Sequence, residues 1–257
     1  MGPTQTRLDI CGVSTPILRA GRGAPVLVLE GATNVEGWLP FYDALAQTHE
    51  VILPTHPGYA GQPAPEWLDR VADLANFHLD LMDALDLRDV RLLGFSLGGW
   101  TAAELATRER SRIAALALVA PSGLYVPGAE PLDVFLRTDE QLFDDLFFDP
   151  ALAAQWREAR TAPDSEDLRL QSKVTTAKLA WNPRWYDPHL RKWLHRVRAP
   201  TTIVWGADDA FLPCAHAEEW RKLIPGAQTK IISACGHHPQ IEQPEALRAA
   251  LASFLSA

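Results

Sequence analysis

The stretch Leu92-Leu93-Gly94-Phe95-Ser96-Leu97-Gly98-Gly99 decides which fold this chain can adopt. It contains the pattern Gly-x-Ser-x-Gly, which places a serine on a sharp turn between a strand and a helix with its hydroxyl clear of the backbone. Gly94 and Gly98 suit such a turn because side chains there would collide as the chain reverses direction around an unfavourable backbone conformation. The pattern therefore predicts that Ser96 is a nucleophile.

A pattern this short also occurs by chance, so the residues around it must support the interpretation, and they do. Val90, Leu92 and Leu93 form an apolar run before the serine, and residues 100–108 have the character of a helix after it. This is the strand-turn-helix setting that the pattern requires. The alternative is a glycine-rich loop that only begins a helix.

Apolar runs and helical periodicities alternate along the chain. The spacing predicts strands at 7–11, 16–20, 26–29, 51–53, 113–120, 201–205 and 229–232, besides the one before Ser96. It predicts helices at 38–47, 67–87, 100–108, 214–223 and 244–255, with His78 on the core-facing stripe of the second. The alternation indicates an α/β fold with a mostly parallel sheet, helices on both faces, and ligands at the carboxyl ends of the strands.

The alternation breaks between residues 124 and 197, where amphipathic pieces carry many aromatic side chains. We interpret this stretch as a helical cap that packs over the catalytic edge of the sheet and lines an apolar pocket. The alternative is that most of these rings form a small core of the cap itself. The chain then divides into a first part of the core at 1–123, the cap at 124–197, and a second part of the core at 198–257.

Composition excludes several classes of protein. Of the 257 residues, 47% are apolar and 22% charged, and no run approaches the roughly 18 apolar residues that span a membrane. The net charge of -8, without a basic cluster, argues against nucleic acid as a partner. Three scattered cysteines favour a reducing compartment, and the N-terminus has no apolar secretory signal, so we expect a cytoplasmic protein.

A serine needs a base to remove its proton, and the base needs a third group that fixes its tautomer. Candidate acids, Asp208 and Asp209, lie in the segment 206–213 after one predicted strand. Candidate bases, His237 and His238, follow the last predicted strand. The chain order is Ser, Asp, His, as in hydrolases with this serine pattern.

The chain resembles capped members of the α/β-hydrolase fold superfamily along nearly its whole length, and is similar to small-molecule esterases and carbon-carbon bond hydrolases. The matching segments are the serine turn, Pro57-Gly58-Tyr59-Ala60-Gly61, the Gly-x-x-Asp-x-x-x-Pro of residues 206–213, and Gly236-His237. The resemblance implies an eight-stranded, mostly parallel sheet with a helical cap. It also favours Asp209 over Asp208 as the acid and His237 over His238 as the base.

The resemblance further implies an oxyanion hole made by two backbone N–H groups, those of Leu97 and Ala32. Preorganised donors of this kind stabilise the negative charge that develops on an attacked carbonyl oxygen. The resemblance implies neither a metal ion nor an organic cofactor.

Glu30 departs from the family pattern, because relatives usually have His-Gly where this chain has Glu30-Gly31. An ionised carboxylate beside a developing oxyanion would oppose it. Glu30 is therefore neutral, paired away, or used in a structural contact. The alternative hypothesis is that Glu30 adjusts acid-base chemistry in a reaction other than ester hydrolysis, with His238 and Asp208 as further modulators.

Together these observations predict a serine hydrolase that uses Ser96, His237 and Asp209. The expected substrate is a small, largely apolar ester, thioester, lactone or vinylogous diketone held under the cap of a monomer or homodimer. Two alternatives stay open: a lyase or eliminase that uses His237 as base, and a catalytically silent ligand-binding protein on the same fold.

Overall fold

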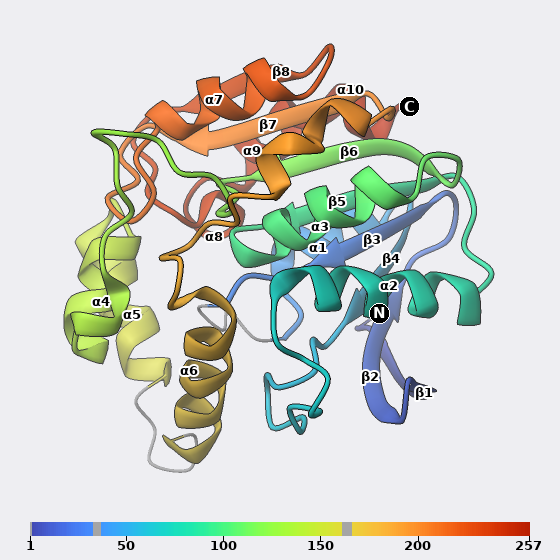
Figure 1. Cartoon of the computed structure of the whole chain (residues 1–257), viewed down its shortest axis with the longest axis horizontal. Helices are drawn as coiled ribbons and strands as arrows, with labels where there is room; N and C mark the ends of the chain where they lie inside the picture. The colour runs from blue at the N-terminus through green and yellow to red at the C-terminus, as the bar shows by residue number, and fades with distance from the viewer. Residues whose placement is uncertain (1, 33–36, 161–165) are drawn as a thin grey trace.

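An eight-stranded sheet runs through the molecule in a computed structural model that describes residues 2–32, 37–160 and 166–257 (Figure 1). The strand order is β1-β2-β4-β3-β5-β6-β7-β8. β2 pairs antiparallel with β1 and β4, and all other neighbours are parallel, so the predicted mostly parallel sheet is confirmed. The strands are β1 (Thr4–Ile10), β2 (Val13–Ala20), β3 (Pro25–Leu29), β4 (Glu50–Pro54), β5 (Val90–Phe95), β6 (Ile113–Val119), β7 (Thr201–Gly206) and β8 (Gln228–Ile232).

The sheet is covered on both faces, as the continuous apolar runs of its central strands require. In β3, Val26 and Val28 pack into one core and Leu27 and Leu29 into the other, and all four are fully buried. Each such side chain contributes roughly 1.5–3 kcal/mol of hydrophobic free energy. The helices on the valine face are α1 (Pro40–Ala46), α9 (Pro244–Ala250) and α10 (Ala252–Leu255), and those on the leucine face are α2 (Val71–Ala84), α3 (Leu97–Arg108) and α7 (Ala215–Leu223).

Several predicted ends of elements were wrong for local reasons. Cys11 is not in a strand, because Cys11 and Gly12 both have positive φ (50° and 76°) and form the two-residue turn between β1 and β2. The predicted helix at 67–87 begins only at Val71, after the Asp73 carboxylate accepts hydrogen bonds from the preceding backbone N–H groups. The predicted closing helix at 244–255 is divided into α9 and α10, since the backbone of Leu251 (ψ 5°) leaves the helical region.

Apart from an isolated bridge between Gly123 and Tyr186, the described residues between β6 and β7 are helical or irregular. The bounds of the predicted cap, 124–197, stay a prediction. Figure 1 shows the three longer helices of this segment together at one end of the sheet. They are α4 (Asp139–Leu146), α5 (Pro150–Arg160) and α6 (Glu166–Ala180), accompanied by the 3₁₀ turns η1 (Val134–Leu136), η3 (Leu190–Lys192) and η4 (Leu194–Arg196). Thr138 caps α4 by accepting from the backbone N–H of Gln141 at 3.2 Å.

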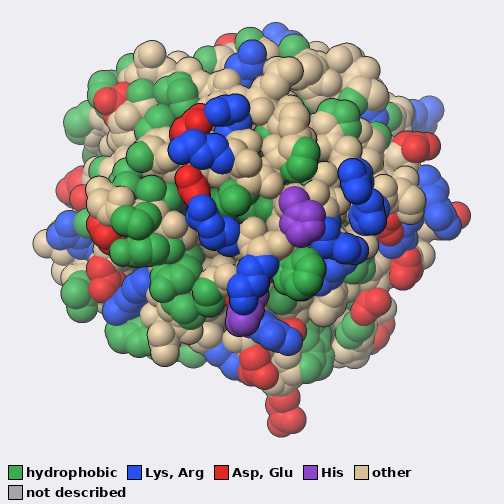
Figure 2. All heavy atoms as spheres, turned by 45° about the horizontal axis from the view of Figure 1, so that its top comes forward, with side chains coloured by type: hydrophobic (Ala, Val, Ile, Leu, Met, Phe, Trp, Pro, Cys, Tyr) green, Lys and Arg blue, Asp and Glu red, His purple; other side chains and the backbone are tan. Residues whose placement is uncertain are grey.

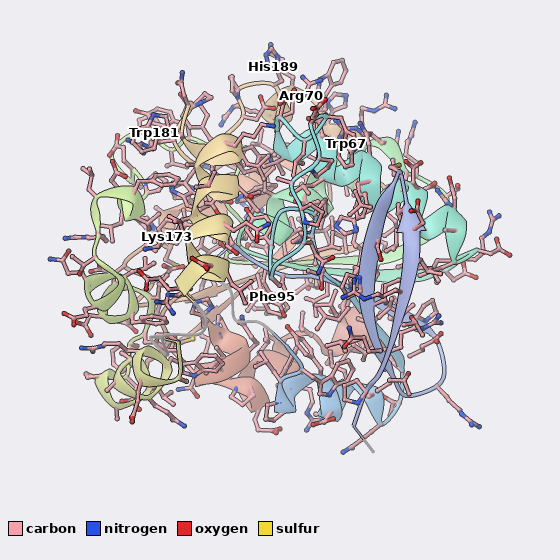
Figure 3. The ribbon with its side chains drawn as sticks, turned by 90° about the horizontal axis from the view of Figure 1, so that it is seen from below. Trp67, Arg70, Phe95, Lys173, Trp181 and His189 are labelled. Atoms are coloured by element: carbon pink, nitrogen blue, oxygen red, sulfur yellow. The ribbon has the colours of Figure 1, made fainter. Side chains whose placement is uncertain are left out.

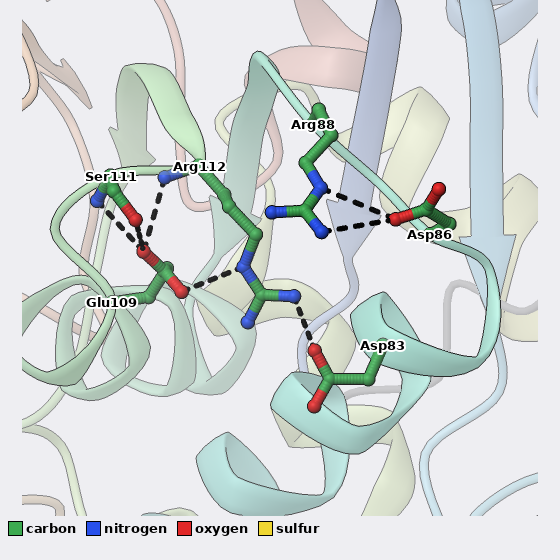
Figure 4. A network of polar contacts seen from close by, with 6 residues as sticks. All are labelled: Asp83, Asp86, Arg88, Glu109, Ser111 and Arg112. Carbon is green, nitrogen blue, oxygen red and sulfur yellow. Dashed lines mark hydrogen bonds and ion pairs between the residues drawn. The ribbon is translucent and has the colours of Figure 1, made fainter.

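A polar network lies at the amino-terminal ends of the parallel strands, at the other end of the sheet from Ser96 (Figure 4). The guanidinium of Arg112, which directly precedes β6, bonds Asp83 of α2 and lies 2.7 Å from Glu109 at the end of α3. Burial raises the pKa of Glu109, but hydrogen bonds from Ser111 and Arg112 outweigh it and lower that pKa to about 2. The network therefore ties α2 and α3 together at the end of the fold away from Ser96.

The surface carries mixed charge. Figure 2 shows basic and acidic side chains interspersed on one face, with hydrophobic side chains between them. Within the described ranges, none of the helices combines the length and the apolar character needed to cross a membrane.

Candidate active site

Ser96 stands on the turn between β5 and α3 with φ 51° and ψ -116°. A non-glycine residue in this region carries backbone strain of order 1–3 kcal/mol, which the surrounding structure must hold in place. A Cβ atom on Gly98 would lie 2.1 Å from the carbonyl oxygen of Leu29, and one on Gly94 would lie 2.4 Å from that of Gly98. The two glycines are thus required by close packing, whereas the unfavourable backbone conformation belongs to the serine itself.

The loop after β3 lies directly beside Ser96. A Cβ atom on Gly31 would lie 3.1 Å from the Cβ atom of Ser96, and Ala32 follows, 9% exposed. Leu97 is the first residue of α3, where helical N–H groups have no partner within the helix. Both predicted oxyanion donors thus belong to segments next to the serine, and their catalytic role stays a prediction.

His237 and Asp209 form a buried hydrogen-bonded pair. His237 Nδ1 lies 2.8 Å from Asp209 Oδ2, although the residues are 28 positions apart in the chain. The other carboxylate oxygen of Asp209 accepts from the backbone N–H groups of Phe211 (3.0 Å) and Leu212 (2.9 Å). Because an ionised carboxylate only accepts, Nδ1 of His237 carries the proton and Nε2 presents the lone pair that a base needs.

The neighbouring acid and histidine take other positions. Asp208 is exposed, and its backbone N–H donates to the carbonyl oxygen of Cys235 at 3.0 Å. The His238 ring contacts Phe147, with ring centroids 5.2 Å apart, and its Nδ1 lies 3.4 Å from the Gln240 amide. The structure therefore joins Asp209, and not Asp208, to His237 by a hydrogen bond. His238 contacts His237 only through its ring, edge-on with centroids 5.2 Å apart.

No hydrogen bond joins Ser96 to His237. Both side chains are 3% exposed, and neither Ser96 Oγ nor His237 Nε2 has a hydrogen-bond partner among the described residues. In enzymes, hydrogen bonds between catalytic groups are often long before a substrate binds. Two of the three predicted catalytic groups are thus brought into contact, and the serine lies buried at the carboxyl end of β5, which β6 separates from β7.

Glu30 is held through both its side chain and its backbone. Its carboxylate accepts a hydrogen bond from the Tyr42 hydroxyl of α1, and its backbone carbonyl accepts one from His56 Nε2 at 3.0 Å. This geometry favours the structural contact among the alternatives for Glu30. Its influence on the reaction stays a prediction.

Glu242, which was not among the predicted site residues, lies on the short helix α8 (Pro239–Glu242). One carboxylate oxygen accepts from the Gly236 N–H at 2.9 Å and the other from the Phe148 N–H at 2.7 Å. In addition, the backbone N–H of His237 donates to the Leu146 carbonyl at 2.8 Å. Glu242 therefore ties the loop that carries His237 to the segment after α4, and nothing in the local sequence marks it for this task.

A cavity of about 310 Å³ opens between Ala32 and the cap. Much of its wall is apolar and comes from η1, α4 and the segment at the end of α6. These side chains are Val134, Phe135, Leu142, Phe143, Trp181 and Trp185. The predicted aromatic pocket is confirmed for these rings, whereas Phe148 and Trp193 remain about half exposed and Phe147 stacks on Trp156 within the cap.

The aromatic wall of this cavity continues to the His237 ring. The Trp185 ring stacks on Phe135, with centroids 5.8 Å apart, and meets Phe211 edge-on at 4.9 Å. Phe211 in turn meets the His237 ring edge-on at 4.8 Å. These ring contacts thus connect the wall of the cavity to the His237 ring.

The charged side chains of the cavity are all basic. Arg137, Arg169 and Lys173 line it, and no acidic residue does so among the described lining residues. Arg137 is paired with Asp145 at 3.0 Å. Figure 3 labels Lys173 and Trp181 beside α6, on the side toward α4. The cavity is therefore apolar with a basic rim, in a chain whose net charge is -8.

Comparison with known proteins places this chain in a family. The alpha/beta hydrolase family matches residues 26–250. A 2-hydroxy-6-oxo-6-phenylhexa-2,4-dienoate hydrolase of Burkholderia cepacia is 27% identical over 92% of this chain and 89% of its own length. A poly(3-hydroxyalkanoate) depolymerase of Ectopseudomonas oleovorans is 30% identical over 90% of this chain and 84% of its own length.

Among solved structures, a serine hydrolase involved in carbazole degradation is 26% identical, with a TM-score of 0.78 and 99% of both chains covered. The family match extends from β3 to the end of α9 and includes the Ser96 turn and the loops that carry Asp209 and His237. The predicted fold and family are confirmed. The chain belongs to the alpha/beta hydrolase family.

Proposed function

We propose that this protein is a serine hydrolase in which Ser96 attacks a carbonyl carbon, His237 transfers the proton, and Asp209 holds His237 in the required tautomer. The observation that carries the proposal is the 2.8 Å contact between His237 Nδ1 and Asp209, which leaves Nε2 as the acceptor. The strained, buried position of Ser96 supports it, because strain of this kind is concentrated at functional sites.

The chemistry follows from these positions. As the Ser96 oxygen bonds the carbonyl carbon, its proton passes to His237 Nε2, and negative charge develops on the carbonyl oxygen. The N–H groups of Ala32 and Leu97 would stabilise that charge, each by about 3 kcal/mol. The bond to the leaving group then breaks, the leaving group takes the proton from His237, and water hydrolyses the acyl-serine by the same route in reverse.

For the substrate, we propose a small acid with an apolar body and a ketone or ester carbonyl. The apolar cavity suits the body, and the basic rim of Arg137, Arg169 and Lys173 suits a carboxylate. Several relatives are named as hydrolases of 2-hydroxy-6-oxo-dienoic acids. We therefore favour cleavage of the carbon-carbon bond beside a ketone, in which the leaving carbon takes the proton from His237.

The nucleophile is tested with a fluorophosphonate probe and a p-nitrophenyl ester. Ser96→Ala should abolish both covalent labelling and turnover. The control is Ser122→Ala, which removes another buried hydroxyl close to Ser96, since the Ser122 backbone N–H donates to the Ser96 carbonyl. This variant should keep both labelling and turnover. Labelling that persists in Ser96→Ala would show that the nucleophile is assigned wrongly.

The substrate class is tested with a pair of compounds that differ only in a carboxylate and its methyl ester. Lys173→Met should reduce the preference for the carboxylate about 10-fold, the value of one charged hydrogen bond. The control is Lys178→Met on the same helix. Lys178 pairs with Asp69 and does not line the cavity, so its replacement should leave the preference unchanged. Turnover in ¹⁸O-labelled water identifies the reaction, because a lyase or eliminase would give products without the label.

A further inference from the structure

A buried pair of histidines lies behind the loop that follows β3. His56, in the loop after β4, is 3% exposed, and His78, in α2, is fully buried. His56 Nε2 lies 3.0 Å from the Glu30 carbonyl oxygen, and His56 Nδ1 lies 2.7 Å from His78 Nε2. The pair thus connects α2 to the loop that carries Ala32.

The hydrogen bonds of this pair have a defined direction. A carbonyl oxygen only accepts, so the proton of His56 is on Nε2. His56 Nδ1 therefore accepts from His78 Nε2–H, which keeps His56 in the tautomer that donates to Glu30. Burial lowers the pKa of His56 to about 4, so that this neutral arrangement is present at pH 7.

The backbone of Glu30 and Gly31 is held between this pair and the serine turn. A Cβ atom on Gly98 would lie 2.3 Å from the Glu30 carbonyl oxygen, and one on Gly31 would lie 3.1 Å from the Ser96 Cβ atom. The serine turn blocks movement of the loop in one direction. The hydrogen bond from His56 opposes movement in the other.

We infer that His56, held by His78, is a positioning residue that keeps the Glu30–Ala32 segment against Ser96 and so places the Ala32 N–H for the transition state. The inference rests on the proposed serine hydrolase function. Neither histidine touches the substrate cavity, so their effect must pass through the backbone of this segment. Displacement of a catalytic group by about 1 Å can reduce the rate about 100-fold.

The first test compares His56→Leu, which removes the donor, with His56→Gln, whose amide N–H takes the place of Nε2. With p-nitrophenyl butyrate, His56→Leu should lower kcat about 10- to 100-fold with KM nearly unchanged, because an oxyanion donor acts only in the transition state. His56→Gln should restore most of kcat. The rate of fluorophosphonate labelling should follow kcat in both variants.

The matched control is His49→Leu. His49 precedes β4, whereas His56 follows it, and His49 Nε2 likewise lies 3.0 Å from a backbone carbonyl, that of Leu255. Loss of the donor should lower the melting temperature in both variants, but only His56→Leu should lower kcat. A purely structural role for His56 would lower the melting temperature without this specific loss.

The inference is overturned if His56→Leu keeps the kcat and labelling rate of the wild type, or if His56→Gln loses as much kcat as His56→Leu. Should His56→Leu fail to fold, His56→Gln and His78→Leu decide the question, and His78→Leu should lower kcat in the same direction by a smaller factor. Failure of the proposed function is seen separately, as wild-type protein that is not labelled at Ser96.

Discussion

Asp209→Asn changes one buried atom beside the base and tests the centre of the proposed mechanism. The carboxylate oxygen Oδ2 accepts the Nδ1 proton of His237 at 2.8 Å, while Oδ1 accepts from the N–H groups of Phe211 and Leu212. The asparagine oxygen can keep the two backbone contacts. Its NH₂ group then faces His237 Nδ1, where two donors cannot meet.

The histidine must therefore present a lone pair at Nδ1 and carry its proton on Nε2. In that tautomer His237 cannot take the proton of Ser96, and a comparable change in a serine protease lowers kcat about 10⁴-fold. A factor of 10⁴ corresponds to about 5.5 kcal/mol of transition-state stabilisation. The free energy of unfolding should fall by only about 1–3 kcal/mol, because one buried hydrogen bond to a charged group is lost and the fold is kept.

The assay measures kcat with p-nitrophenyl butyrate, the rate of fluorophosphonate labelling, and urea unfolding. Asp208→Asn is the control, since Asp208 is adjacent, exposed and outside the pair. It should leave all three measurements unchanged. The reasoning is refuted if Asp209→Asn keeps kcat within about 10-fold of the wild type while folding normally, or if Asp208→Asn causes the larger loss.

Three further predictions concern stability. Gly98→Ala should lower the free energy of unfolding by about 3 kcal/mol or more and abolish labelling, because its Cβ would lie 2.1 Å from the Leu29 carbonyl oxygen. Glu109→Gln should be less stable than wild type above pH 4.5, and the difference should shrink as pH falls toward 2, because the folded-state pKa is about 2. The folded-state pKa of His56 is about 4, below the ordinary 6.5, so its contribution to the free energy of unfolding is full above pH 6.5 and falls by about 3 kcal/mol by pH 4. His56→Leu should flatten this dependence of stability on pH. Loss of His78, whose pKa is also lowered by burial, should act in the same direction.

Each of these predictions has a control or a contradictory outcome. Gly2→Ala places a Cβ where nothing lies within 4 Å, and it should not change stability. Glu245→Gln removes an exposed ion pair with Arg248 and should have no measurable effect at any pH. Urea unfolding curves at several pH values measure the free energy of unfolding of each variant. Parallel pH profiles for wild type and His56→Leu would contradict the pKa assigned to His56.

The sequence predicted the elements of the core well because the signals for them are local. A continuous apolar run such as 26–29 can satisfy its side chains only as a strand covered on both faces, and the structure buries each of these residues completely. Element ends were less accurate. The start of α2 depends on the carboxylate of Asp73, and the end of β1 depends on positive φ at Cys11, which a residue pattern does not reveal.

The sequence by itself determined that this chain forms an α/β sheet, that Ser96 occupies its strained turn, and that acid and base candidates follow later strands. These conclusions rest on periodicity and on the steric needs of glycine, which act over a few residues. Only the tertiary structure decided that Asp209 meets His237, that the Glu30 carboxylate turns to Tyr42, and that a histidine pair supports the backbone of Glu30. Each of these contacts joins different elements of the fold, so it depends on how those elements pack.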